Sequence, residues 1–146
     1  MNIIEFFDQN WQLQKWQQGF SKRERTLLTG LSGTAKSLVM ANAYENVADK
    51  YIIVTDSQFH ANELYDELST LLGEEKVFQF FSDDNIYAEF ALASKDRVAY
   101  RLEALNFLLD EKSTGFLVVP FLVLLIYLPS PEKFLEKYLL LTSWDE

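Results

Sequence analysis

Short β-branched runs that alternate with segments of helical periodicity constrain the fold of this chain most strongly. Residues 51–55 (YIIVT) and 116–119 (FLVV) are typical of strands buried on both faces of a parallel sheet. Between these runs, apolar residues recur at intervals of three and four, as one face of a helix requires. The alternation predicts an α/β domain of three layers, with helices on both faces of a mainly parallel sheet.

The expected elements follow a simple order. We expect helix over residues 3–19, a short strand at 25–29, a glycine-containing turn, and a helix from about 36 to 48. A helix therefore precedes the first strand. Further strands are expected at 51–55, 77–81 and 116–119, with another candidate at 139–141.

Two of the intervening helices have recognisable ends and faces. Asp56 or Ser57 is expected to cap one helix, which Gly73 ends, and Ser94 to cap another. The apolar face of the first comprises Ala61, Leu64, Tyr65, Leu68, Leu71 and Leu72. That of the second comprises Val98, Leu102, Leu105 and Leu109.

The longest apolar run covers residues 116–128 and is too short to span a membrane. Its thirteen residues fall below the roughly 20 that a bilayer requires. We interpret it as a buried strand that continues into a short helix, apolar on every side and in need of cover. The N-terminus has no basic, apolar signal segment. We therefore expect a cytoplasmic chain without membrane contact, and the absence of cysteine excludes disulfides and Cys-ligated zinc.

The charge of the chain is negative and unevenly placed. Residues 1–37 carry five basic and three acidic side chains, whereas the remainder carries eight basic and nineteen acidic ones. An acidic surface repels nucleic acid, because affinity for DNA depends on neutralising phosphates. The composition therefore argues against DNA binding over the whole surface and favours basic partners.

One chemical motif stands between the expected strand at 25–29 and the helix that follows. The segment 30–37 (GLSGTAKS) approaches the phosphate-loop pattern G-x-x-x-x-G-K-[ST]. In such a loop, backbone N–H groups and the helix N-terminus face the phosphates, while the lysine and the hydroxyl contact phosphate oxygens and Mg²⁺. The candidate cofactor-binding residues are Gly30, Ser32, Gly33, Thr34, Ala35, Lys36 and Ser37.

The motif departs from the pattern at Ala35, where glycine should precede the lysine. A methyl group there hinders the close backbone approach that glycine permits. Hydrolysis also needs a second acidic motif, and Asp145 and Glu146 lie too far beyond the last apolar run. We expect no catalytic residue and no metal site, and a decayed loop that serves as a turn. Binding of Mg-ATP is the alternative.

Beyond the motif, the chain resembles a known family in an ordered set of short segments. Residues 26–37 resemble the first helicase motif of the excinuclease B protein, and the N-terminal region of bacterial transcription-repair coupling factors is closer still. Further segments resembling that region are 2–5 (NIIE), 41–44 (ANAY), 60–64 (HANEL), 71–75 (LLGEE), 101–109 (RLEALNFLL) and 128–132 (LPSPE).

The resemblance implies a helicase-like domain and a role in transcription-coupled nucleotide-excision repair. It implies a helical segment at 1–24, a phosphate-loop-like α/β domain at 25–128, and the start of a docking domain at 129–146. The implied partners are the excinuclease A protein and other domains of the same chain. A full-length protein would contact RNA polymerase and DNA as an ATP-dependent translocase.

Two other functions stay open on the sequence. One is a working ATP-binding domain, and the other is a stand-alone truncated interaction protein. The stretch 86–94 is too short for the hairpin with which the excinuclease B protein grips damaged DNA, so we do not expect damage recognition.

Overall fold

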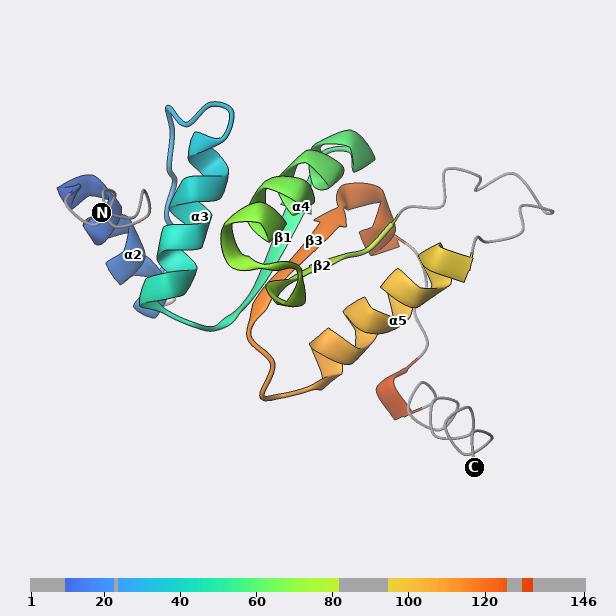
Figure 1. The fold of residues 1–146 in the computed structure, drawn as a ribbon. Coiled ribbons are helices and arrows are strands. Elements are labelled where there is room, and N and C mark those ends of the chain that lie inside the picture. The colour runs from blue at the N-terminus through green and yellow to red at the C-terminus, as the bar shows by residue number, and fades with distance from the viewer. Residues whose placement is uncertain (1–9, 23, 82–94, 126–129, 133–146) are drawn as a thin grey trace.

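The computed structural model describes residues 10–22, 24–81, 95–125 and 130–132. Its helices are α2 (Trp11–Ser21), α3 (Ala35–Asn46), α4 (Gln58–Leu72) and α5 (Lys95–Leu109), as Figure 1 shows. The strands are β1 (Lys50–Thr55), β2 (Val77–Gln79) and β3 (Gly115–Pro120). Two 3₁₀ turns, η1 (Glu74–Lys76) and η2 (Phe121–Leu125), precede β2 and follow β3.

The three strands form one parallel sheet in the order β1-β3-β2. β3 is the central strand, and all six of its residues are buried. Its continuous apolar sequence is what a strand covered on both faces and paired on both edges needs. The predicted α/β class and parallel sheet are therefore confirmed, with β2 shorter than the expected strand at 77–81.

Helix α4 covers one face of the sheet. Its buried Ala61 and Leu68 pack against Val77, Phe116 and Val118 of the sheet. Every residue expected on its apolar face belongs to this core: Ala61, Leu64, Tyr65, Leu68, Leu71 and Leu72. The ends are also as predicted, because the Ser57 hydroxyl accepts the His60 N–H and Gly73 ends the helix at φ 94°.

Helix α5 covers the opposite face through residues that share Leu105 with the predicted set. Ala104 and Phe107 are buried against Leu117 and Val119 of β3, and Phe107 stacks on Phe78 at 4.4 Å between ring centroids. Leu105 and Leu108 complete the contact, whereas Leu102 and Leu109 are not part of this cluster. The prediction was incomplete because it followed the spacing of aliphatic residues and left out the ring of Phe107, which stacks on the sheet.

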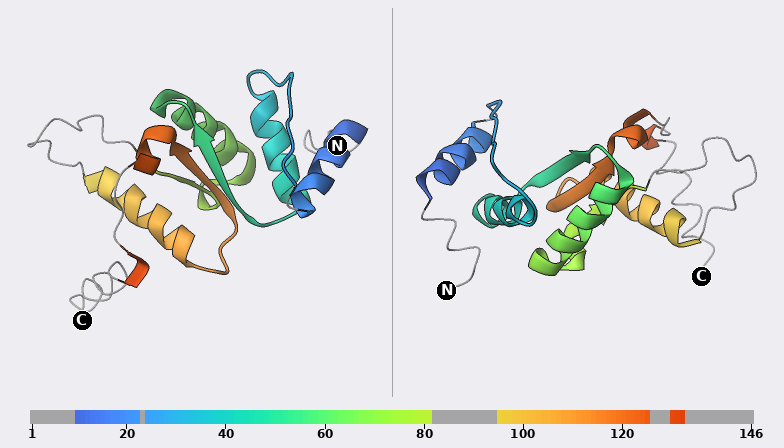
Figure 2. Two further views of the ribbon diagram at one scale, coloured as in Figure 1. Left: turned by 180° about the vertical axis from the view of Figure 1, so that it is seen from behind. Right: turned by 90° about the horizontal axis from the view of Figure 1, so that it is seen from above.

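The predicted strand at 25–29 is absent, and this prediction was wrong. Residues 24–29 have no regular structure, and the Leu27 side chain is 88% exposed. In the left view of Figure 2, this segment runs on the side of α3 that faces α2, away from the sheet. A segment becomes a strand only when its peptide groups pair with a neighbouring strand, and in the described part of the chain the sheet consists of β1, β3 and β2 alone. The motif at 30–37 therefore precedes a helix but does not extend from a strand of the sheet.

The apolar run after position 115 divides as expected into a buried strand and a short helical turn. In η2, Val123 is buried while Phe121, Leu122, Leu124 and Leu125 are at least half exposed. No helix in the described part of the chain is long and apolar enough to cross a bilayer. The expected strand at 139–141, the helix cap Ser94 and residues 3–9 lie outside the described ranges.

Candidate functional site

A groove of about 480 Å³ lies where α3, β1 and α4 meet. One wall is the start of α3, with Gly33, Lys36 and Ser37. The opposite wall is the first half of α4, and the carboxyl end of β1 lies between the two walls. The groove thus combines part of the glycine-containing motif with the strand end where ligands bind in many parallel α/β proteins.

The structure brings only some of the candidate motif residues to this groove. Gly30 and Gly33 adopt positive φ angles of 85° and 53°, which glycine accepts without strain. Ser32, Thr34 and Lys36 are exposed and Ala35 is half-buried. Ser37 is completely buried. Of the seven candidates, Gly33, Lys36 and Ser37 line the groove.

A carboxylate from α4 accepts hydrogen bonds from two hydroxyl groups of the motif. The Ser37 hydroxyl donates a hydrogen bond to Glu67 Oε2, and the Thr34 hydroxyl donates to Glu67 Oε1 at 3.2 Å. Ser37 is the residue expected to hold Mg²⁺ in a working loop. In this chain its proton is directed to an internal acid, and the bond ties α3 to α4.

Sequence reasoning missed Glu67. It gives no motif signal, because acidic residues are common on helices. The available clue was spacing, since Glu63 and Glu67 are four residues apart and share one face of α4. Together with Asp56 they place three carboxylates in the groove against the single lysine Lys36.

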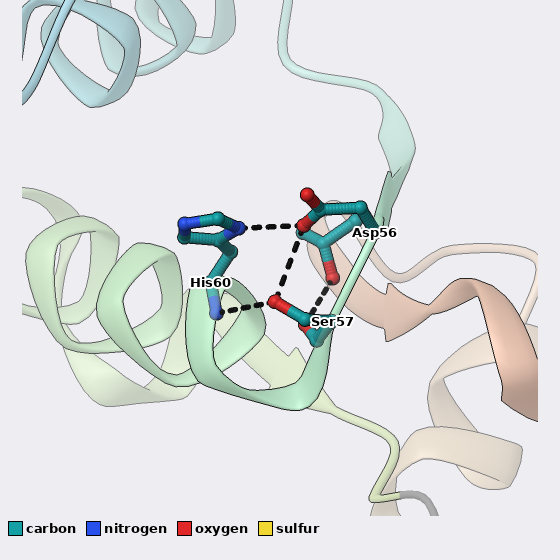
Figure 3. A network of polar contacts seen from close by, with 4 residues as sticks. Asp56, Ser57 and His60 are labelled. Atoms are coloured by element: carbon teal, nitrogen blue, oxygen red, sulfur yellow. Dashed lines mark hydrogen bonds and ion pairs between the residues drawn. The ribbon is translucent and has the colours of Figure 1, made fainter.

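A second polar cluster lies at the junction of β1 and α4 (Figure 3). His60 Nδ1 lies 2.6 Å from Asp56 Oδ1, and the Ser57 hydroxyl donates to the same oxygen at 3.2 Å. The His60 N–H in turn bonds the Ser57 hydroxyl at 3.3 Å. His60 is exposed. The cluster fixes the first turn of α4, and the hydrogen bond from His60 lowers the pKa of the Asp56 carboxyl.

We expect His60→Ala to raise the pKa of Asp56 towards its ordinary value, because the His60 hydrogen bond is the largest cause of the lowering. A carbon-13 NMR titration of the Asp56 carboxyl measures this directly. Phe59→Ala is the control, since it removes a ring beside the imidazole but not the bond. An Asp56 titration unchanged in His60→Ala would contradict the assignment.

The direction of the linked stability change follows from the lowered pKa. The ionised form of Asp56 favours the folded chain above about pH 4, the ordinary range of an aspartate. That contribution disappears as the pH falls through the lowered pKa of the folded state. Because Asp56 is exposed, solvent screening keeps this contribution small.

The groove lacks a set of side chains suited to a metal. Among the described residues, no group of three or more histidine, cysteine, aspartate or glutamate side chains is placed to hold an ion. The groove presents carboxylates, which can accept hydrogen bonds from cationic or N–H donor groups of a ligand. Arg25 is exposed and lies outside the groove, while Asp145 and Glu146 lie outside the described ranges.

Comparison with known proteins identifies transcription-repair-coupling factors among the relatives of this chain. The chain is 36% identical to the transcription-repair-coupling factor of Bacillus subtilis (strain 168) over 81 residues, which is 55% of this chain and 7% of that protein. It is 27% identical to the factors of Staphylococcus aureus strains USA300 and MRSA252 over 95 residues, 65% of this chain and 8% of theirs.

No family model matches the chain, and no solved structure matches it significantly. The matched part of the chain covers less than a tenth of the length of these curated relatives. It is related in sequence to the N-terminal region of transcription-repair-coupling factors.

Proposed function

We propose that this chain is a protein-docking module in transcription-coupled DNA repair and catalyses no reaction itself. The observation that carries the proposal is its sequence relation to transcription-repair-coupling factors. That relation supports a role in the same process. We also propose that its α/β domain is a helicase-like phosphate-loop domain, because residues 30–37 approach the phosphate-loop pattern.

The geometry of the groove supports docking over nucleotide binding. Glu67 accepts the hydroxyl protons of Ser37 and Thr34, so Mg²⁺ would have to displace a formed pair of hydrogen bonds. A triphosphate would also approach Asp56 and Glu63, and like charges at short range repel. Ala35 adds a methyl group where the backbone of a working loop approaches the phosphates.

The proposed partner is the excinuclease A protein, as the resemblance of the chain implies. RNA polymerase and DNA would be contacted through a longer protein, whose motor would supply ATP-dependent translocation. The acidic body of this chain, with nineteen acidic against eight basic residues after position 37, favours a basic surface on the partner.

A working Mg-ATP site is the second candidate function, and the position of three motif residues at the start of α3 favours it. Gly33, Lys36 and Ser37 face the same groove at the start of the twelve-residue helix α3. A helix N-terminus offers unpaired N–H groups and a partial positive charge to an anion. Glu67 would have to rotate away before this site could fill.

Two titrations of the purified chain separate the candidates. We expect no saturable heat with Mg-ATP at millimolar concentration, because Glu67 occupies the motif hydroxyls. Saturable binding that Lys36→Ala abolishes would replace the docking proposal with the nucleotide-binding one. In the second titration, immobilised chain should bind purified excinuclease A protein and not an unrelated acidic protein. A folded chain that fails to bind the excinuclease A protein would refute the proposed partner.

A further inference from the structure

The outer edge of β1 is unpaired in the described part of the chain. β1 pairs only with β3, from Lys50↔Gly115 to Thr55↔Pro120. Gly115 N–H donates to the Asp49 carbonyl, and this register directs the peptide groups of Tyr51 and Ile53 towards β3. The peptide groups of Ile52 and Val54 therefore point away from the sheet. Such an edge is a template for another strand.

The side chains of the same two residues form an apolar strip beside that edge. Ile52 is 55% exposed and Val54 is 50% exposed. They lie on the face opposite α4, since Tyr51 and Ile53 pack into the α4 core. Helix α5 does not cover them, because its cluster contains residues of β2 and β3 but none of β1. An added strand would pair its own apolar side chains with this strip.

The other face of an added strand would meet the acidic groove. Ile53, Val54 and Thr55 line the groove together with Glu63 and Glu67. Glu67 is already bonded to α3, whereas no hydrogen bond or ion pair to Glu63 is found among the described residues. A side chain on this face would point between α3 and α4, where a positive charge is favoured.

We infer that the edge of β1 and the adjoining groove form a docking site for an extended segment of a partner protein. The segment adds as a strand beside β1, with apolar side chains over Ile52 and Val54 and a basic side chain towards Glu63. Main-chain hydrogen bonds supply affinity in this mode and the alternate side chains supply specificity. The inference deepens the proposed docking role and rests on it for its biological meaning.

A short capped peptide tests the backbone part of the site. In this probe, valine alternates with threonine, and arginine replaces the central threonine, so that arginine and the valines face opposite sides. Val54→Pro removes the outward N–H, and proline is tolerated at an edge in that orientation. We expect it to weaken peptide binding about tenfold or more. Val54→Thr, which keeps the N–H and the branched side chain, is the matched control.

Charge variants test the groove. Glu63→Lys should weaken binding of the arginine peptide about tenfold, because it replaces the attractive charge with a repulsive one. Glu45→Lys makes the same change on an exposed residue of α3 outside the groove and should alter binding less than about twofold. A peptide with glutamate in place of arginine should bind the unchanged chain at least about tenfold more weakly.

Amide exchange observed by NMR shows where the peptide lies. In the chain alone, the Ile52 and Val54 amides should exchange faster than those of Tyr51 and Ile53, and the peptide should protect them. Slow exchange without peptide would assign the edge to another segment or to a second copy, and sedimentation would tell these apart. That result overturns the inference. Two further results would do so: Val54→Pro binding the peptide as tightly as the unchanged chain does, or the unchanged chain binding the arginine and glutamate peptides equally.

These outcomes are separable from those of the proposed function. The peptide experiments use the purified chain and contain no repair protein. Failure to bind the excinuclease A protein would leave peptide binding intact and reject only the partner. Failure to bind the peptide, with the excinuclease A protein still bound, would reject the edge of β1 as the docking site and keep the docking role.

Discussion

Replacing Gly115 with alanine should destabilise the folded chain by about 3–5 kcal/mol, a large part of the stability of a small domain. Gly115 begins β3 at φ 144°, a conformation that side chains disfavour. A Cβ at this position would lie 2.3 Å from the backbone oxygen of Lys76. Lys76 directly precedes β2, so relieving the contact would pull β2 away from β3. Urea unfolding followed by circular dichroism measures the loss.

Gly30→Ala is the matched control for this variant. Gly30 also has a positive φ, of 85°, but nothing lies within 4 Å of an added Cβ. It should therefore show only the backbone cost of about 1–2 kcal/mol. Equal losses in the two variants would contradict the role of the Lys76 contact, since the backbone conformation alone would then explain both.

Leu68→Ala should cost about 2–5 kcal/mol of the free energy of unfolding. Leu68 is completely buried and lies in the cluster between α4 and the sheet, with Val77, Phe116 and Val118. Truncation removes methyl groups from this contact and leaves a cavity that the surrounding strands cannot fill. The urea midpoint should fall, while the dependence of the free energy on urea stays unchanged.

Leu27→Ala makes the same chemical change at an exposed position. The Leu27 side chain is 88% exposed on the irregular segment after α2, so its loss should change stability by less than about 0.5 kcal/mol. A large effect of Leu27→Ala would mean that residues 25–29 are packed in solution. The prediction of a strand at that position would then have to be reconsidered.

The sequence alone determined the α4 face of the domain. Ser57, the apolar spacing through Leu72, and Gly73 all act within one helix, so a local pattern suffices to predict them. The runs at 51–55 and 116–119 likewise predicted β1 and β3 as strands. Burial on both faces is confirmed for β3 alone, since Ile52 and Val54 of β1 are half exposed. The class of the fold follows from these elements.

Only the tertiary structure decided the features that depend on neighbours. Residues 25–29 have strand-like composition, yet they pair with no strand of the described sheet, and an unpaired segment forms no strand. The buried face of α5 contains Phe107, stacked on Phe78, besides the predicted Leu105. Glu67 reached Ser37 from thirty residues away, and the unpaired edge of β1 among the described strands is a property of sheet order. Such contacts join distant parts of the chain, and no local spacing records them.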